Sequence, residues 1–154
     1  MKSQNNPIAG KSLKQLVDRL VSDSLNESGH TEHSVVNEMP DNLCVLVDEQ
    51  KEGNVISELL ATVITIAKNG DIHISADQCR DVVTIDIEDR NNYNGYALAA
   101  KLRAIEPDAN RMGGSISIRG ENQLVARVSF SFPLLTVSGN LPPAYSATAH
   151  RYYR

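Results

Sequence analysis

The sequence predicts an α+β fold, a two-layer α/β sandwich with helices on one face of a mixed, mostly antiparallel sheet. Apolar residues recur with helical spacing in three segments, and they alternate with polar residues in several shorter ones. A chain of 154 residues is long enough for one domain with a sizeable core. We expect a flexible leader over residues 1–10, a domain over 11–135 and a tail over 136–154.

The first predicted helix starts at Ser12, where Ser12 and Gln15 fit a capping box. One apolar stripe follows, formed by Leu13, Leu16, Val17, Leu20, Val21 and Leu25. Strands are expected over residues 31–36 and 43–47, with turn residues between them.

The second predicted helix is central and deeply packed. Asp48 is a good N-cap residue and Asn69-Gly70 a good stop signal. A broad apolar face lies between them, made by Val55, Ile56, Leu59, Leu60, Val63, Ile64 and Ala67.

The rest of the chain predicts a hairpin, a helix and a closing strand pair. Residues 72–76 and 83–88 alternate as an antiparallel hairpin, with a turn near Gln78. A helix over residues 96–105 is expected to stop at Pro107. The final run should point Leu124, Ala126, Val128, Phe130 and Phe132 inward.

Composition and isolated polar residues exclude several classes of function. A net charge of −4 gives no general attraction to nucleic acid or an anionic membrane, and no apolar run is long enough to span one. We expect Cys44 and Cys79 to be buried or half-buried free thiols in a reducing, cytoplasmic compartment. His30 and His33 are expected to be polar loop residues, and no metal-ligand spacing is present.

The order of these segments resembles the ATP-binding domain of sensor histidine kinases, a member of the GHKL ATPase family. The segments are DEQKEGNVISELLATVITIA from Asp48 to Ala67, DIHISA, VVTIDIED, GYALAAKLRAI, GGSISI and LVARVSFSFPL. The resemblance covers roughly residues 12–134. It implies a domain that binds ATP with Mg²⁺ on one side of a mixed sheet.

The resemblance also implies which residues correspond to the ATP site. In the family, the long helix carries an Asn that holds Mg²⁺, with an acidic residue four positions earlier. Here Glu58 takes the acidic position and Thr62 the place of the Asn. A hydroxyl is a weaker ligand than a carbonyl oxygen for this cation.

The glycine motifs of the family are only partly present. Asp89 matches the Asp that bonds adenine, but Asn91 and Tyr93 replace both glycines that follow it, and the tyrosine ring is expected to enter the nucleotide space. The lid between the two motifs is reduced to a few residues before Gly95, the one glycine retained in the second motif.

The sequence therefore predicts a catalytically inactive, stand-alone domain with neither cofactor nor metal, acting as a protein-interaction or regulatory module. Only about ten residues precede the first helix, too few for the family's dimerisation and phospho-acceptor hairpin. The expected partner is a histidine kinase or a response regulator, and a homodimer is possible, with residues 142–154 as a candidate contact. The alternative is an ATP-binding histidine kinase or anti-sigma-type kinase that retains Mg-ATP binding through Glu58, Thr62, Asp89 and Gly95.

Overall fold

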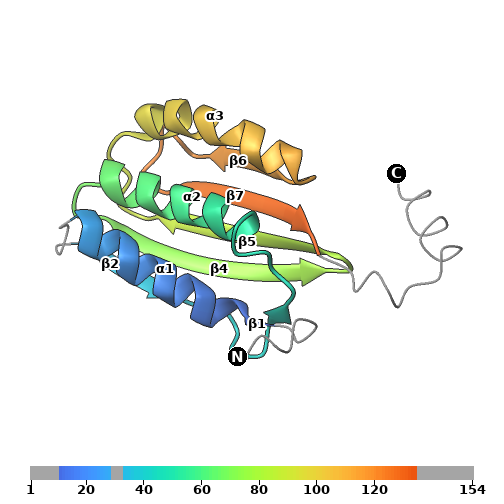
Figure 1. Ribbon diagram of the computed structural model, residues 1–154. Coiled ribbons are helices and arrows are strands. Elements are labelled where there is room, and N and C mark those ends of the chain that lie inside the picture. Colours follow the sequence, from blue (N-terminus) through green and yellow to red (C-terminus); the bar gives the residue numbers. More distant parts are fainter. Residues whose placement is uncertain (1–10, 29–32, 135–154) are drawn as a thin grey trace, which may run out of the picture.

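The computed structural model describes residues 11–28 and 33–134, so His30, the leader and the tail lie outside its description (Figure 1). Its elements, in chain order, are β1 (Lys11–Ser12), α1 (Leu13–Ser28), β2 (Ser34–Asn37), β3 (Cys44–Val45), α2 (Glu52–Ile66), β4 (Asp71–Cys79), β5 (Val82–Asp89), α3 (Gly95–Arg111), β6 (Ser115–Arg119) and β7 (Ala126–Pro133).

The main sheet has five strands in the order β2-β4-β5-β7-β6. Only β2 and β4 are parallel; the other neighbours are antiparallel, and β1 pairs with β3 as a separate small ribbon. The three helices lie side by side over one face of the sheet (Figure 1). The predicted α+β two-layer sandwich is therefore confirmed.

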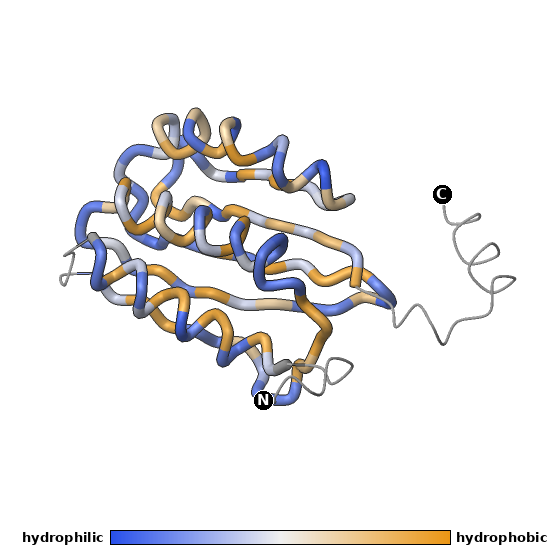
Figure 2. Tube along the Cα trace, in the orientation of Figure 1, coloured by the Kyte–Doolittle hydropathy of each residue, from blue (hydrophilic) through white to orange (hydrophobic). Residues whose placement is uncertain are grey.

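The core lies between these two layers, and the strands show the alternation expected of a sheet with one covered face (Figure 2). In the register, Ile85 stands opposite Ala76 on one side and Phe130 on the other. The residues predicted to meet in the core are all buried: Val55, Leu59, Leu60, Val63, Ile74, Ile85, Ile87, Ile116, Val128 and Phe130.

Helix α1 begins where the sequence predicts, because the Ser12 hydroxyl oxygen accepts a hydrogen bond from the Gln15 amide at 3.3 Å. The first four residues of its apolar stripe are buried, with Leu13 and Val17 fully inaccessible, and Val21 and Leu25 are partly buried. The predicted N-cap of α2 is wrong. Asp48 caps the turn before the helix, accepting from the Gln50 amide at 2.8 Å, and Lys51 occupies the N-cap position without a side-chain hydrogen bond.

Helix α3 does not stop at Pro107 as predicted; it continues through that residue to Arg111. Proline removes one backbone hydrogen-bond donor from the helix, but two contacts of Ala109 stabilise the last turn. Ala109 is fully buried, and its carbonyl accepts from the amide of Gly114 at 2.9 Å. Burial of Ala109 and the hydrogen bond at its carbonyl outweigh the local preference to end the helix.

Three residues predicted to be buried or half-buried are exposed: Cys44, Cys79 and Leu124. Each lies at or near the end of a strand. Strand β4 runs past Gln78 to Cys79, and the turn falls at Arg80, which has a positive φ of 60°. Cys79 lies beside this turn and Cys44 in a strand of two residues, so both free thiols are exposed. Leu124 precedes β7 and is 64% exposed.

His33 lies outside any helix or strand, as expected of a loop residue, but it is buried. Its Nε2 donates to the carbonyl of Ile64 at 2.9 Å, and its Nδ1 accepts from the amide of Gly70 at 2.9 Å. These two bonds require the neutral Nε2–H tautomer. His33 thus joins the last turn of α2 to the start of β4.

The face of the sheet that points away from the three helices carries polar side chains paired across strands. Glu88 accepts from Arg127 at 2.8 Å and from Arg90 at 2.8 Å, and these two guanidinium groups hold the pKa of Glu88 below its usual value. His73 lies between two carboxylates, with Nδ1 2.8 Å from Glu38 and Nε2 2.9 Å from Asp71. Carboxylates only accept, so this geometry fits a protonated imidazole.

We predict that Leu60→Ala or Phe130→Ala lowers the free energy of unfolding by about 2–5 kcal/mol, because each leaves a cavity in a close-packed interior. Both side chains are 1% exposed. Leu124→Ala is the matched control and should change stability by less than about 0.5 kcal/mol. Urea denaturation measures all three; an equal loss for Leu124→Ala would contradict the placement of the core.

We also predict a pH-dependent contribution from His73. The hydrogen bond to Glu38, and to a smaller extent that to Asp71, raises its pKa above 6.5, while burial and the nearby Arg90 oppose the rise. Its stabilisation is therefore complete below the unfolded-state value and is lost as pH rises through the higher folded-state pKa. His73→Gln should be less stable than the parent chain at pH 6, and the difference should shrink towards pH 9. A difference in urea stability that is constant over this range would refute the assignment.

Candidate functional site

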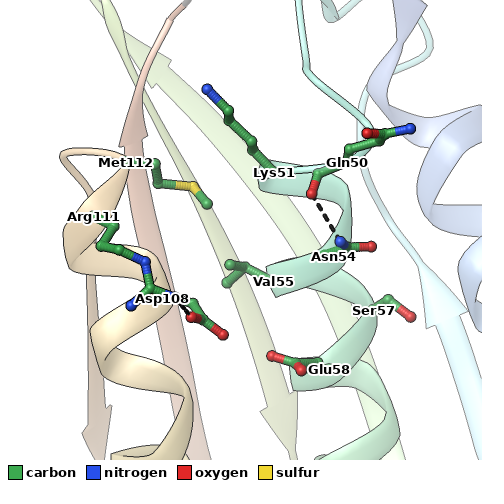
Figure 3. A pocket seen from close by; sticks show the side chains of 9 residues that line it. All are labelled: Gln50, Lys51, Asn54, Val55, Ser57, Glu58, Asp108, Arg111 and Met112. Atoms are coloured by element: carbon green, nitrogen blue, oxygen red, sulfur yellow. Dashed lines mark hydrogen bonds and ion pairs between the residues drawn. The ribbon is translucent and has the colours of Figure 1, made fainter.

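A cavity of about 570 Å³ opens between the first half of α2 and the end of α3 (Figure 3). This volume is in the range of small-molecule sites. Val55 and Glu58 point from α2 towards Asp108 and Met112 on the opposite wall (Figure 3). The lining residues are Gln50, Lys51, Asn54, Val55, Ser57, Glu58, Asp108, Arg111 and Met112.

The charges around this cavity balance. Lys51 and Arg111 are positive and Glu58 and Asp108 are negative, and Arg111 forms an ion pair with Asp108. Val55, 1% exposed, supplies an apolar floor. Such a lining suits a small polar molecule but offers little net attraction to a multiply charged anion such as a nucleoside triphosphate.

Of the four site residues that the sequence singled out, only Glu58 lines this cavity. Thr62 lies one turn further along α2, and its hydroxyl donates to the backbone carbonyl of Glu58 at 2.7 Å. A threonine in this position bonds back to its own helix. The donor of the Thr62 hydroxyl is therefore occupied by a hydrogen bond within the helix.

Asp89 is only 4% exposed, at the end of β5. Its Oδ1 accepts from the amide of Asp71 at 3.2 Å and from the amide of Asn91 at 2.9 Å. The carboxylate thus fastens the start of β4 to the end of β5 and caps the loop that follows. This carboxylate has a structural role that needs no ligand.

Gly95 begins α3 and is a glycine for a steric reason. A Cβ at this position would lie 2.0 Å from the carbonyl oxygen of Glu121. The neighbouring Asn92 fixes the same contact, because its side-chain amide donates to the carbonyls of Glu121 at 3.1 Å and Gln123 at 2.8 Å. The loop of residues 90–94 is therefore packed against the loop between β6 and β7.

Tyr93 does not line the α2–α3 cavity. The side chain is 63% exposed, and the Lys68 ammonium lies 5.0 Å from the centre of the ring. Asn91 donates instead to the carbonyl of Asn69 at 2.8 Å. Both replacements of the glycine motif contact the segment that follows α2.

Sequence reasoning missed Asp108 and Arg111, which form the far wall of the cavity. It ended the helix at Pro107, so neither residue was placed on a helical face. The spacing of Asp108 and Arg111, three apart, would have suggested an ion pair on one helix face had the helix been extended.

Within residues 11–28 and 33–134, no group of three or more His, Cys, Asp or Glu residues is arranged to hold a metal ion. The same residues contain no helix long and apolar enough to cross a membrane.

Comparison with known proteins gives a relationship at the level of structure. No protein-family model and no curated protein sequence matches the chain. The blue-light activated histidine kinase EL346 of Erythrobacter litoralis superposes with a TM-score of 0.63 at 17% identity, over 85% of this chain and 49% of the kinase. The histidine kinase AdeS of Acinetobacter baumannii gives 0.64 at 14% identity, over 82% of this chain and 67% of AdeS.

The similarity lies in one domain of such kinases. The catalytic domain of histidine kinase ThkA superposes with a TM-score of 0.60 at 15% identity, over 79% of this chain and 93% of that domain. This chain spans about half the length of the EL346 kinase. It has the fold of histidine kinase catalytic (ATPase) domains.

Proposed function

We propose that this chain is a non-catalytic form of the histidine kinase ATPase domain and acts as a protein-interaction or regulatory module in two-component signalling. The observation that carries the proposal is the loop of residues 90–94. The kinase domains that this chain resembles place a lid between the positions of Asp89 and Gly95. Here the short loop joins these two residues directly, and Asn92 ties it to the β6–β7 loop. Without a lid, bound phosphates would stay open to water.

The residues at the expected ATP positions support the same proposal. Asp89 gives one oxygen to two backbone amides, and Gly95 is required by the carbonyl of Glu121. The Thr62 hydroxyl donates a hydrogen bond to the carbonyl of Glu58 in its own helix. Asp89, Gly95 and Thr62 are thus explained by the fold without a nucleotide, so their presence is no argument for ATP binding.

The proposed partner is a histidine kinase or a response regulator in the cytoplasm, where these proteins exchange phosphoryl groups. A domain that keeps the kinase fold can compete for surfaces that a kinase uses, even when its own site is inactive. In a reconstituted phosphotransfer reaction, adding this chain should change the rate of transfer between its partner kinase and regulator. No effect on any such pair would count against the signalling role.

The alternative function is ATP binding by an active kinase or an anti-sigma-type kinase. The observation in its favour is the cavity beside Glu58, which is large enough for a small ligand. Its balanced charges speak against a triphosphate, since Lys51 and Arg111 are offset by Glu58 and Asp108.

We predict that Mg-ATP produces no heat of binding in calorimetry up to several millimolar and no change in melting temperature. Millimolar affinity needs only about 4 kcal/mol, yet one hydrogen bond to Asp89 would contribute about 1 kcal/mol net. A histidine kinase catalytic domain measured under the same conditions is the positive control. Asp89→Asn keeps the oxygen that accepts the two amides, so this variant should fold. A thermal shift in the parent chain that disappears in Asp89→Asn would establish the alternative.

A further inference from the structure

The chain leaves the described part of the domain beside the α2–α3 cavity. Strand β7 ends at Pro133, and the amide of Leu134 donates to the carbonyl of Asp81 at 2.8 Å. Pro133 also lies against the turn that follows α3, because a Cβ on Gly113 would be 3.4 Å from the Cγ of this proline. Gly113 follows Met112, which lines the cavity. The segment after Leu134 therefore begins next to the cavity wall.

The directions of the helices and of β7 give the same placement. Figure 1 shows the start of α2, the end of α3 and the end of β7 at one end of the molecule. The cavity is lined by the first turns of α2 and the last turn of α3, so it lies at that end. Residues 1–10, by contrast, join the domain at β1, which contacts α1 on the other flank of α2. Of the two terminal segments, residues 135–154 are the one that starts at the cavity.

A short part of this segment is long enough to cross the cavity. From Lys51 to Glu58 the α2 wall is about 11 Å long, at about 1.5 Å per helical residue. Residues 135–141, which lie outside the described part of the chain, can reach about 23 Å when extended, at about 3.3 Å per residue. Their reach is roughly twice what is needed, so no part of the domain has to move.

The chemistry of the segment suits the lining. Residues 135–149 contain no Asp, Glu, Lys, Arg or His. A neutral peptide is not repelled by a cavity whose two positive and two negative side chains balance. The α2 wall also carries Gln50, Asn54 and Ser57, whose amide and hydroxyl groups can donate to and accept from a peptide backbone.

Apolar contacts are available on both sides of the cavity. Val55 forms its floor, and Met112 on the α3 side is packed against the hydrophobic core. The segment supplies Leu135 and Val137 within three residues of Leu134. Methionine adapts its shape to irregular apolar neighbours, so Met112 suits contact with such side chains.

We propose that residues 135–141 of this chain pack in the α2–α3 cavity and cover its wall between Lys51 and Glu58. Any ligand or partner segment that enters the cavity then has to displace these residues first. The chain in this way controls access to its own cavity. The proposal goes beyond the signalling role and does not depend on it, because it concerns a contact within one chain.

The reactivity of a single thiol in the cavity tests this. Cys44 and Cys79 are exposed, so both are replaced by serine, and Glu58→Cys places the probe on the α2 wall. Iodoacetamide should label this thiol at least about fivefold more slowly in the full chain than in a chain ending at Leu134, which corresponds to a cavity covered about 80% of the time. Ser22→Cys, at an exposed position of α1, is the matched control and should react equally in both chains.

A second variant keeps the test independent of truncation. In the full chain, Val137→Asp together with Leu141→Asp should raise the labelling rate of Glu58→Cys as much as truncation does, because a charged side chain loses the apolar contacts. All buried core residues of the described domain precede residue 133, so the melting profile by circular dichroism should stay that of the parent.

Two results would overturn the proposal. One is an equal labelling rate of Glu58→Cys in the full chain, in the chain ending at Leu134 and in the double aspartate variant. The other is protection that grows with protein concentration between about 1 and 100 μM, because the covering segment would then come from a second copy. Protection that is independent of concentration and lost in both altered chains is the expected result.

Discussion

Burial of α2 is the constraint on which the rest of the structure depends. The helix is apolar on more than one side, and eight of its residues are buried: Glu52, Gly53, Val55, Ile56, Leu59, Leu60, Val63 and Ile64. The sheet can cover only one side of it. Helices α1 and α3 therefore pack on its two flanks, and each buries its own narrower stripe there. This three-helix layer fixes the position of the α2–α3 cavity.

The same constraint explains the electrostatics at the start of α2. Glu52 is 2% exposed, and its carboxylate accepts from the amide of Asp48 at 2.9 Å. Asp48 in turn holds the amide of Gln50. The chain entering α2 is thus fixed by two carboxylates bonded to backbone amides. These bonds set where Lys51 stands at the mouth of the cavity.

The sequence predicted the layers and the core because period 3.6 and period 2 are strong signals over long segments. It failed where a tertiary contact overrides a local preference. The helix passes Pro107 because Ala109 is buried, and His33 is buried because α2 leaves the Ile64 carbonyl to be satisfied. The Ile64 carbonyl lies 31 residues from His33 in the sequence, so no local pattern could reveal this contact.

The candidate site was less predictable than the fold for the same reason. The resemblance to kinase ATPase domains identified Glu58 and Asp89 by position, but position does not say what each side chain bonds. In the structure, Asp89 is bonded by two backbone amides, and the wall opposite Glu58 comes from the helical turn beyond Pro107. The sequence therefore predicts the fold better than the site, since the fold depends on residue patterns and the site on individual side-chain contacts.

We have proposed that Asp89 serves the fold and does not bind adenine. The most direct measurement is a titration of the ¹⁵N-labelled chain with Mg-ADP, followed by nuclear magnetic resonance at the amides of Asp71 and Asn91, which donate to the Asp89 carboxylate. If Asp89 serves only the fold, neither amide signal moves up to several millimolar nucleotide. Saturable shifts of both signals, absent with Mg²⁺ alone, would contradict it.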